Sequence, residues 1–487
     1  MIITELQQLY AAHPNVEGMY RLLQDNSVRH LYCSGLCASA ASLFSSVLIQ
    51  RVECPFVFIL GDLEEAGYFY HDLTQILGTE QVLFFPSSFR RAIKYGQKDA
   101  ANEILRTEVL SRLQKGEEGL CVVTYPDALA EKVVSRKELG DKTLKLHLGE
   151  KVDMDFVTEV LRSYSFEYVD YVYEPGQYAV RGSIIDVFSF SSEFPFRIDF
   201  FGDEVESIRT FEVESQLSKE KKENIVIVPD LSHSLEQRGN GGMVSFLDFL
   251  QPDTLLAMKD FLWLRERIQT VHDEALTAQA IAAREAEENG LISLDGKLID
   301  GGEFTLRALD FRRIEFGTKP TETPDATVTF NTTAQPIFHK NFDLVAESFH
   351  DYLSRNYALY ICSDSLKQTE RIRAIFEDRG DNISFTSVER TLHEGFADDA
   401  LRLCIFTDHQ LFDRFHKYNL KSDKARSGKV ALSLKELNQF TPGDYVVHTD
   451  HGVGRFTGLV RIPNGDTTQE VMRLVYQNDD VVFVSIH

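Results

Sequence analysis

The sequence predicts a multidomain α/β protein, and two patterns support this prediction. Short apolar segments alternate with helical patterns over residues 1–142 and again over 318–412, which is typical of parallel sheets covered by helices. Between these regions, residues 173–216 are rich in β-branched and aromatic residues and are broken by glycines, as in a β-rich domain. At 487 residues the chain has the length of three or four domains that each bury a core.

Residues 1–142 are expected to form the first α/β fold. Each strand candidate is short, apolar and bounded by turn or capping residues, and a helical pattern separates it from the next candidate. The expected strands are Val28–Cys33, Phe56–Leu60, Gln81–Phe85 and Leu120–Thr124, and the expected helices are Ala38–Gln50, Leu63–Leu77 and Ala100–Gln114.

The loop after the first strand is the place where such a fold carries a phosphate-binding loop. A working loop of the G-x-x-x-x-G-K-[ST] type needs glycines and a lysine that reaches the terminal phosphates. Here Ala38 stands at the lysine position, only Ser39 matches the motif, and Gly35 falls at one of its free positions. The sequence therefore predicts a degenerate nucleotide loop that binds no nucleotide.

The β-rich region carries charges in unusual places. Arg181 and Arg197 each lie inside an apolar run, and Phe201 follows Arg197 in the same expected strand. Because side chains alternate between the faces of a strand, Arg197, Asp199 and Phe201 are expected to share one face. Arginines beside an aromatic residue are typical of protein-binding hot spots. The alternative is a solvated face on which the arginines form ion pairs with Asp199 or Glu204.

This region also resembles a known family. The segments EPGQYAVRGSIIDVF and PFRIDFFGDEVESIRTF resemble the domain shared by the UvrB subunit of nucleotide excision repair and the transcription-repair coupling factors (the Mfd family). The resemblance implies a UvrA-binding domain over residues 143–224, with Arg181, Arg197 and Phe201 at the positions of the family's contact residues. Reversing both arginine charges is expected to abolish UvrA binding and to leave the fold intact.

The resemblance extends to the flanking regions. It implies that residues 1–142 and 225–317 are the two halves of a UvrB-like, helicase-type fold, supported by the segment FFPSSFRRAIKYGQK at 84–98. In UvrB this fold carries a working ATP site, whereas in the coupling factors it has lost that site. Ala38 therefore favours the coupling factors over UvrB.

The last part of the chain contains three further segments. A Pro/Thr-rich linker at 317–326 leads into a small α/β domain at 318–412, and a basic stretch follows within a linker at 413–434. The segment GDYVVHTDHGVGRFTGL, within residues 435–487, resembles the start of the RNA polymerase-interacting domain of the coupling factors, a CarD-like, Tudor/SH3-like β-barrel. The resemblance places Ile462 where the family meets the polymerase β subunit.

Composition argues against broad nucleic-acid binding, a membrane-spanning segment and a metal site. A formal net charge of −24 repels nucleic-acid backbones, and no apolar run reaches the roughly 18 residues that span a bilayer. Six scattered cysteines are expected to be reduced core thiols, and no metal site is expected. A cytoplasmic protein with no membrane partner is the resulting expectation.

The sequence thus predicts a non-catalytic adaptor for transcription-coupled nucleotide excision repair, with UvrA and the RNA polymerase β subunit as partners. The resemblance implies that full-length relatives continue into motor domains that use ATP and Mg²⁺, translocate on DNA and make the whole protein a hydrolase. No cofactor is expected within these residues. Two alternatives remain: a UvrB-like ATP-dependent enzyme that handles damaged DNA, and a CarD-type transcription regulator.

Overall fold

A computed structural model describes residues 1–88, 100–141, 143–213, 215–230, 243–285, 296–416, 418, 441–448, 452–464, 467–476 and 480–485. The chain divides into two compact units, Met1–Ser422 and Asp423–His487, and each is described by itself. Among the described residues, no helix is long and apolar enough to cross a membrane.

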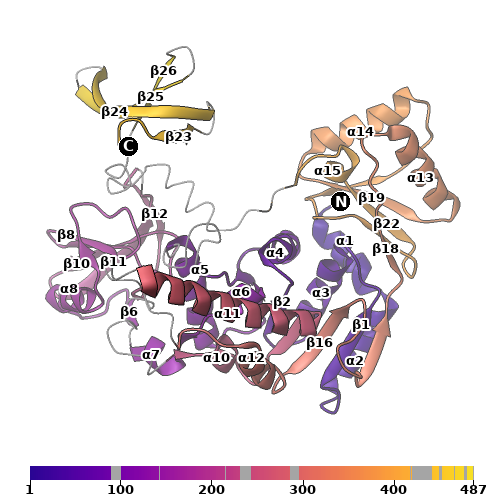
Figure 1. The fold of residues 1–487 in the computed structure, drawn as a ribbon, viewed down its shortest axis with the longest axis horizontal. Helices are drawn as coiled ribbons and strands as arrows, with labels where there is room; N and C mark the ends of the chain where they lie inside the picture. Colours follow the sequence, from indigo (N-terminus) through magenta and orange to yellow (C-terminus); the bar gives the residue numbers. More distant parts are fainter. Residues whose placement is uncertain are drawn as a thin grey trace. The chain divides into compact units, whose positions relative to one another are not determined.

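The first unit is built on a seven-stranded sheet in which every neighbouring pair is parallel (Figure 1). Its order, β17-β1-β16-β15-β2-β4-β3, interleaves strands from residues 1–142 with strands from after residue 250. The expected parallel sheet is confirmed, and both expected halves contribute to it. Its strands are β1 (His30–Ser34), β2 (Phe56–Ile59), β3 (Val82–Phe84), β4 (Cys121–Thr124), β15 (Leu255–Lys259), β16 (Arg312–Gly317) and β17 (Ala326–Thr329).

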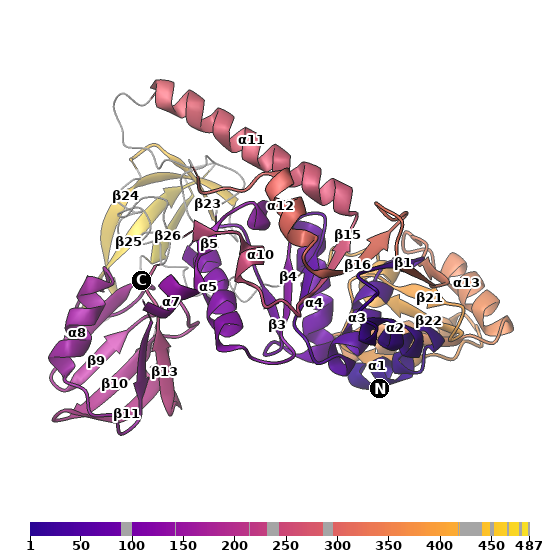
Figure 2. The same cartoon turned by 90° about the horizontal axis from the view of Figure 1, so that it is seen from below.

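Helices cover both faces of this sheet, with α3 and α4 on one side and α11 and α12 on the other (Figure 2). The helix α4 begins where the Asp62 side chain accepts a hydrogen bond from the Glu65 N–H, and it ends at Gly78. Its bounds match the expected helix. The helices are α1 (Ile3–Ala11), α2 (Pro14–Gln24), α3 (Ala40–Arg51), α4 (Leu63–Leu77), α5 (Ala100–Lys115), α6 (Pro126–Leu129), α7 (Arg136–Asp141), α10 (Phe246–Phe249), α11 (Phe261–Glu285) and α12 (Gly301–Ala308), and β5 (Val133–Val134) pairs with β14 (Met243–Val244).

A β-rich module is inserted between the two halves of the large fold. Its six-stranded sheet has the order β12-β11-β10-β9-β8-β7. The first and last strands of the module in the sequence, β6 and β13, pair with each other in a separate two-stranded sheet. One face of the sheet packs against α8 in a hydrophobic core of its own. The elements are β6 (Leu144–His147), α8 (Met154–Ser163), β7 (Glu167–Tyr168), β8 (Gln177–Arg181), β9 (Ile184–Val187), β10 (Phe196–Phe201), β11 (Glu204–Phe211), β12 (Ser218–Lys221) and β13 (Asn224–Ile227).

A second α/β sheet follows, in the order β18-β21-β22-β19-β20. Its start corrects one expectation: β17, which begins at the last residue of the expected linker, belongs to the large sheet, so the change between the sheets falls after Thr329 rather than at residue 318. The elements are β18 (Thr332–Ala334), α13 (Phe342–Ser354), β19 (Ala358–Ser363), α14 (Leu366–Asp378), β20 (Thr386–Glu389), β21 (Phe396–Asp398), β22 (Leu403–Thr407) and α15 (Asp408–Leu411).

The second unit contains a four-stranded antiparallel sheet whose strands follow one another in chain order. Phe456, Met472 and Leu474 are buried at its centre. The strands are β23 (Tyr445–His448), β24 (Gly452–Asn464), β25 (Thr467–Val475) and β26 (Val481–Ser485). Closure into a Tudor/SH3-like barrel stays a prediction. Most of the basic linker, residues 417 and 419–434, lies outside the described residues.

Four histidines gather where α4 meets the smaller α/β sheet. The ring of His416 lies 4.3 Å from that of His409, 5.0 Å from that of His71 and 6.1 Å from that of His393, measured between centroids. Tyr68 stacks on His393 at 3.5 Å. Burial lowers the pKa of His71 and of His409 to about 4 and that of His393 to about 3. The imidazoles are therefore uncharged at neutral pH.

The first unit should lose stability as the pH falls from about 6.5 to about 4. Histidines of the unfolded chain bind protons near pH 6.5, whereas the buried ones do so only near pH 4, so the unfolded state binds more protons in this window. Each such group lowers the unfolding free energy by ~1.4 kcal/mol per pH unit. Asp72, whose pKa burial raises to about 6, opposes this with one proton.

Urea unfolding at pH 7 and pH 5 measures this effect. His71→Gln should flatten the pH dependence, because it removes one buried imidazole. His272→Gln is the matched control, since His272 lies on α11 and its side chain is 26% exposed. Equal stability of the unchanged protein at the two pH values would contradict the prediction.

Candidate functional site

The outer face of the inserted module is set by the alternation of β10. Phe196, Ile198 and Phe200 are buried toward α8, whereas Arg197 and Asp199 are partly exposed and Phe201 is 77% exposed. The expected sharing of one face is confirmed. The strand pleat therefore places both charged side chains and the aromatic ring on the side away from the module's core.

Asp186 lies at the centre of this face. It is directly opposite Arg197 in the pairing of β9 with β10, and its side chain is fully buried. The Arg197 guanidinium donates to it twice, from Nε to Oδ1 at 2.7 Å and from Nη2 to Oδ2 at 2.9 Å. These hydrogen bonds raise the pKa of Arg197. Such a fork-to-carboxylate pair fixes the direction of the arginine as well as its charge.

Arg181 reaches the same carboxylate from the next strand. Arg181 is opposite Ile184, two residues before Asp186, so its side chain approaches Asp186 diagonally. Its Nη2 donates to Asp186 Oδ2, and its guanidinium lies over the Tyr171 ring, 5.0 Å from the centroid. The structure therefore brings both predicted arginines together around one buried acid.

The alternative partners expected from the sequence are wrong for this cluster. Asp199 accepts a hydrogen bond from Ser183 Oγ at 3.0 Å and lies 3.8 Å from Arg209 Nη2. Glu204 is paired with Phe201 across the turn that joins β10 to β11. The arginines do form ion pairs within the module, but their partner comes from a neighbouring strand.

Phe201 stands at the end of the β10–β11 hairpin. The connecting residues are Gly202 and Asp203, and Gly202 has a φ of +66°, a left-handed conformation that a residue with a side chain rarely adopts. This tight turn holds the Phe201 ring out at the surface, with 77% of it exposed. From ideal strand spacing, its Cα lies roughly 12 Å from that of Arg181. An exposed ring near partly exposed guanidiniums is suited to binding a protein surface.

The degenerate loop after β1 is filled by the chain itself. The Thr332 hydroxyl donates a hydrogen bond to the Gly35 carbonyl at 2.6 Å and accepts one from the Cys37 N–H at 3.0 Å. A Cβ at Gly35 would lie 2.0 Å from the Phe330 carbonyl oxygen. The backbone of residues 330–332 therefore packs against the loop.

A second segment binds the loop at Ala38 and Ser39. Ala38 has a φ of +50°, and the buried Ser39 exchanges hydrogen bonds with the Glu394 backbone. The neighbouring Asp72 accepts a hydrogen bond from the His393 N–H at 2.7 Å, and burial raises its pKa to about 6. These contacts use loop donors that a nucleotide phosphate would need, which favours the expectation that none is bound. That expectation remains a prediction.

The third predicted site lies in the second unit. Ile462 belongs to β24 and is opposite Gln469 of β25, while its side chain lies outside the described residues. Its role in polymerase binding therefore stays a prediction.

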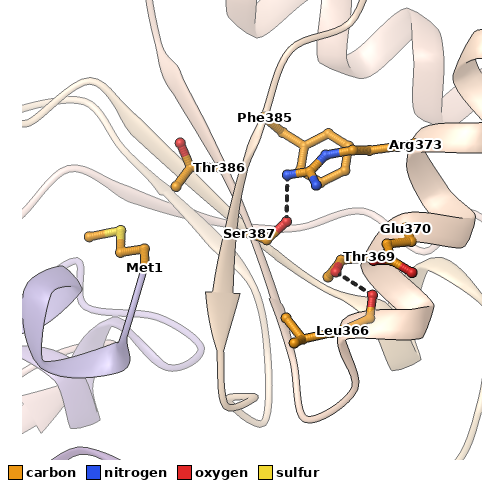
Figure 3. A pocket seen from close by; sticks show the side chains of 8 residues that line it. All are labelled: Met1, Leu366, Thr369, Glu370, Arg373, Phe385, Thr386 and Ser387. Atoms are coloured by element: carbon orange, nitrogen blue, oxygen red, sulfur yellow. Dashed lines mark hydrogen bonds between the residues drawn. The ribbon is translucent and has the colours of Figure 1, made fainter.

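An open pocket of about 350 Å³ lies in the smaller α/β domain, between α14, β20 and the chain start (Figure 3). Arg373 lies over the Phe385 ring and donates to Ser387 Oγ at 2.8 Å. The arginine is therefore already engaged within the domain. Across the described part of the chain, no three His, Cys, Asp or Glu side chains are placed to hold a metal ion. The lining residues are Met1, Leu366, Thr369, Glu370, Arg373, Phe385, Thr386 and Ser387.

Sequence reasoning missed Asp186 and Tyr171. The signal for Asp186 was present: it is an acidic residue inside the apolar run IIDVF, where an unpaired charge would be costly. Tyr171 gave no such signal, because its contact with Arg181 depends on how the chain before β8 crosses the sheet.

Two family models match the chain. The UvrB interaction domain matches residues 144–233, which include the inserted module, and the CarD-like/TRCF RID domain matches residues 440–487, the region of the four-stranded sheet. The chain is also similar to curated proteins over most of its length. It is 23% identical to a transcription-repair-coupling factor of Staphylococcus aureus (strain bovine RF122 / ET3-1) and 22% identical to that of Bacillus subtilis (strain 168).

Both matches cover 93% of this chain and 44% of the relative. The chain therefore spans less than half the length of the curated relatives it matches.

Millimolar ATP or ADP with Mg²⁺ should leave the melting temperature of the first unit unchanged. A ligand that binds only the folded state must raise that temperature by mass action. Ala38→Lys restores the motif lysine but leaves the Ser39–Glu394 and Gly35–Thr332 contacts in place, so this variant should also show no shift. A rise in either protein would show that the loop accepts a nucleotide.

Proposed function

We propose that this chain, a homologue of the amino-terminal part of the transcription-repair-coupling factors, is an adaptor that recruits UvrA to RNA polymerase during transcription-coupled excision repair. The outer face of the inserted module would bind UvrA. The carboxy-terminal sheet would bind the polymerase β subunit.

The observation that carries the proposal is the surface formed by Arg181, Arg197 and Phe201. A phenylalanine that is 77% exposed on the same sheet face as two guanidiniums has the composition typical of the centre of a protein interface. The surface lies within the match to the UvrB interaction domain, and its three residues occupy the contact positions implied by the family resemblance. Burial of Phe201 in a partner would remove a large apolar area from water.

Two other functions fit the structure less well. An ATP-dependent enzyme of the UvrB kind would need an open phosphate-binding loop, and here Thr332 and Glu394 occupy the loop's hydrogen-bonding groups. A regulator of the CarD kind would use only the terminal sheet and would leave the exposed Phe201 surface without a role. ATP-driven translocation on DNA would belong to the further domains of the longer relatives.

The variant Arg181→Glu with Phe201→Ala should lose UvrA binding. Charge reversal sets a carboxylate against the acidic group expected on UvrA, and truncation removes the apolar anchor, so a loss of at least about a hundredfold in affinity is expected. Titration of purified UvrA at fixed salt measures it. Arg197 is kept in this variant, because a glutamate at this largely buried position would place a second carboxylate against Asp186, whereas the Arg181 side chain is 37% exposed and a glutamate there can turn toward water.

Arg162→Glu with Phe156→Ala is the matched control for this variant. Both residues are exposed, and both lie on α8, which covers the opposite face of the same sheet. This control should bind UvrA as the unchanged protein does. Equal losses in the two variants, or retained binding in the folded first variant, would refute the assignment of the face.

Ile462→Asp should weaken binding to the polymerase β subunit and leave UvrA binding unchanged. A carboxylate cannot enter an apolar contact without a large desolvation cost. The Arg181→Glu, Phe201→Ala variant should behave in the reciprocal way. Pull-downs of both variants with each partner test the separation, and loss of both partners from one folded variant would contradict it.

A further inference from the structure

The two arginines around Asp186 use their hydrogen-bonding capacity unequally. Arg197 donates from Nε and Nη2 to Asp186 and from Nη1 to the Gln216 carbonyl at 3.1 Å. Its guanidinium also lies 4.5 Å from the centre of the buried Phe211 ring, and its side chain is only 15% exposed. Arg197 is therefore engaged by the module on most of its edges.

Arg181 is placed differently. Its side chain is 37% exposed, and Nη2 donates to Asp186. The Tyr171 ring beneath its guanidinium is 51% exposed. A guanidinium has five N–H donors, so Arg181 has donors left for a partner while Tyr171 and Asp186 hold its plane in a fixed direction.

We infer that the recognition surface divides its work between presenting and positioning residues: Arg181, Tyr171 and Phe201 contact the partner, and Asp186 with Arg197 holds Arg181 in place. This inference rests on the proposed binding of UvrA by this face. Tyr171 thereby becomes a contact residue, and Asp186 and Arg197 become positioning residues.

The same geometry describes the partner's side of the interface. Asp186 neutralises one of the two guanidinium charges, so the cluster presents a net charge of about +1 rather than +2. One acidic side chain on UvrA is therefore enough to pair with Arg181. An apolar pocket for Phe201 should lie beside that acid, on the side toward the β10–β11 turn.

Lysine substitutions test the division of work, because lysine keeps the charge but loses the planar fork. Arg197→Lys should weaken UvrA binding about tenfold or more, since the bidentate bond to Asp186 is lost. Arg181→Lys should weaken it only about threefold, because one exposed cation remains to meet the acid. Equal losses for the two variants would overturn the inference.

Tyrosine substitutions test the new contact. Tyr171→Ala should weaken UvrA binding about fivefold. The substitution removes both the ring on which the Arg181 guanidinium stacks and the surface that Tyr171 itself would present to UvrA. Tyr173→Ala is the matched control: Tyr173 is 54% exposed, similar to Tyr171, and lies two residues away. Its binding should stay within about twofold of the unchanged protein. Unchanged binding by Tyr171→Ala would exclude that residue as a contact.

A double-mutant cycle tests Asp186. Asp186→Asn should weaken UvrA binding in the unchanged background and have a smaller effect in an Arg197→Lys background, because part of its effect passes through the Arg197 ion pair and the rest through its own hydrogen bond with Arg181. A role in the fold alone would lower stability with no such cancellation in binding. Asp199→Asn is the control on the same face, and additive effects of Asp186→Asn and Arg197→Lys would overturn the inference.

The same cycle followed by urea unfolding separates this inference from the proposed function. If the unchanged protein fails to bind UvrA, the proposed function fails, and the contact roles of Arg181 and Tyr171 fail with it. The positioning roles are then decided by unfolding, where Asp186 and Arg197 should be coupled more strongly than Asp186 and Arg181. Equal coupling of both arginines to Asp186 would overturn them.

Discussion

The pairing of β1 with two strands that lie much later in the sequence, β16 and β17, is the constraint on which the rest of the first unit depends. His30 is opposite Arg313 in β16, and Leu31 is opposite Ala326 in β17. The large sheet is therefore complete only when β1 has met strands that lie almost 300 residues later in the sequence. The loop that follows β1 then receives Thr332 and Glu394. A position that is open in a nucleotide-binding fold thus holds the smaller α/β domain against the larger one.

The strands of the inserted module do not pair with the large sheet. The module's chain leaves the large fold after residue 141 and returns after β13, and β6 and β13 pair with each other rather than with the large sheet. Its apolar core is separate from the main core. Because α8 covers one face of the six-stranded sheet, the opposite face carries the arginines and Phe201, and a smaller cluster of Val172, Ala179, Phe188 and Phe211 covers only part of that face. The binding surface follows from this incomplete covering of the second face.

The local parts of this architecture could be predicted from the sequence, and the register could not. The pattern of Leu63–Leu77 predicted α4 to the residue, and alternation predicted which face Arg197 and Phe201 share. The alternative interpretation paired the arginines with Asp199 or Glu204, but their partner is Asp186, whose position opposite Arg197 depends on how β9 aligns with β10. The strand β17 was assigned to the linker and the small α/β domain, because four residues next to prolines and threonines carry too little periodicity to show that they belong to the large sheet.

The net charge of the chain explains why the surface needs such exact placement of its side chains. With 75 acidic and 51 basic residues, the long-range field repels an acidic partner rather than attracting it. Ions screen charges beyond about 8 Å at physiological salt, so a single guanidinium acts only at contact. At that range the gain depends on direction and on loss of water, which Asp186, Tyr171 and the Gly202 turn control. The buried Asp186 halves the local positive charge and so weakens long-range attraction, but it fixes the direction of the arginines at contact. It is therefore compatible with strong binding.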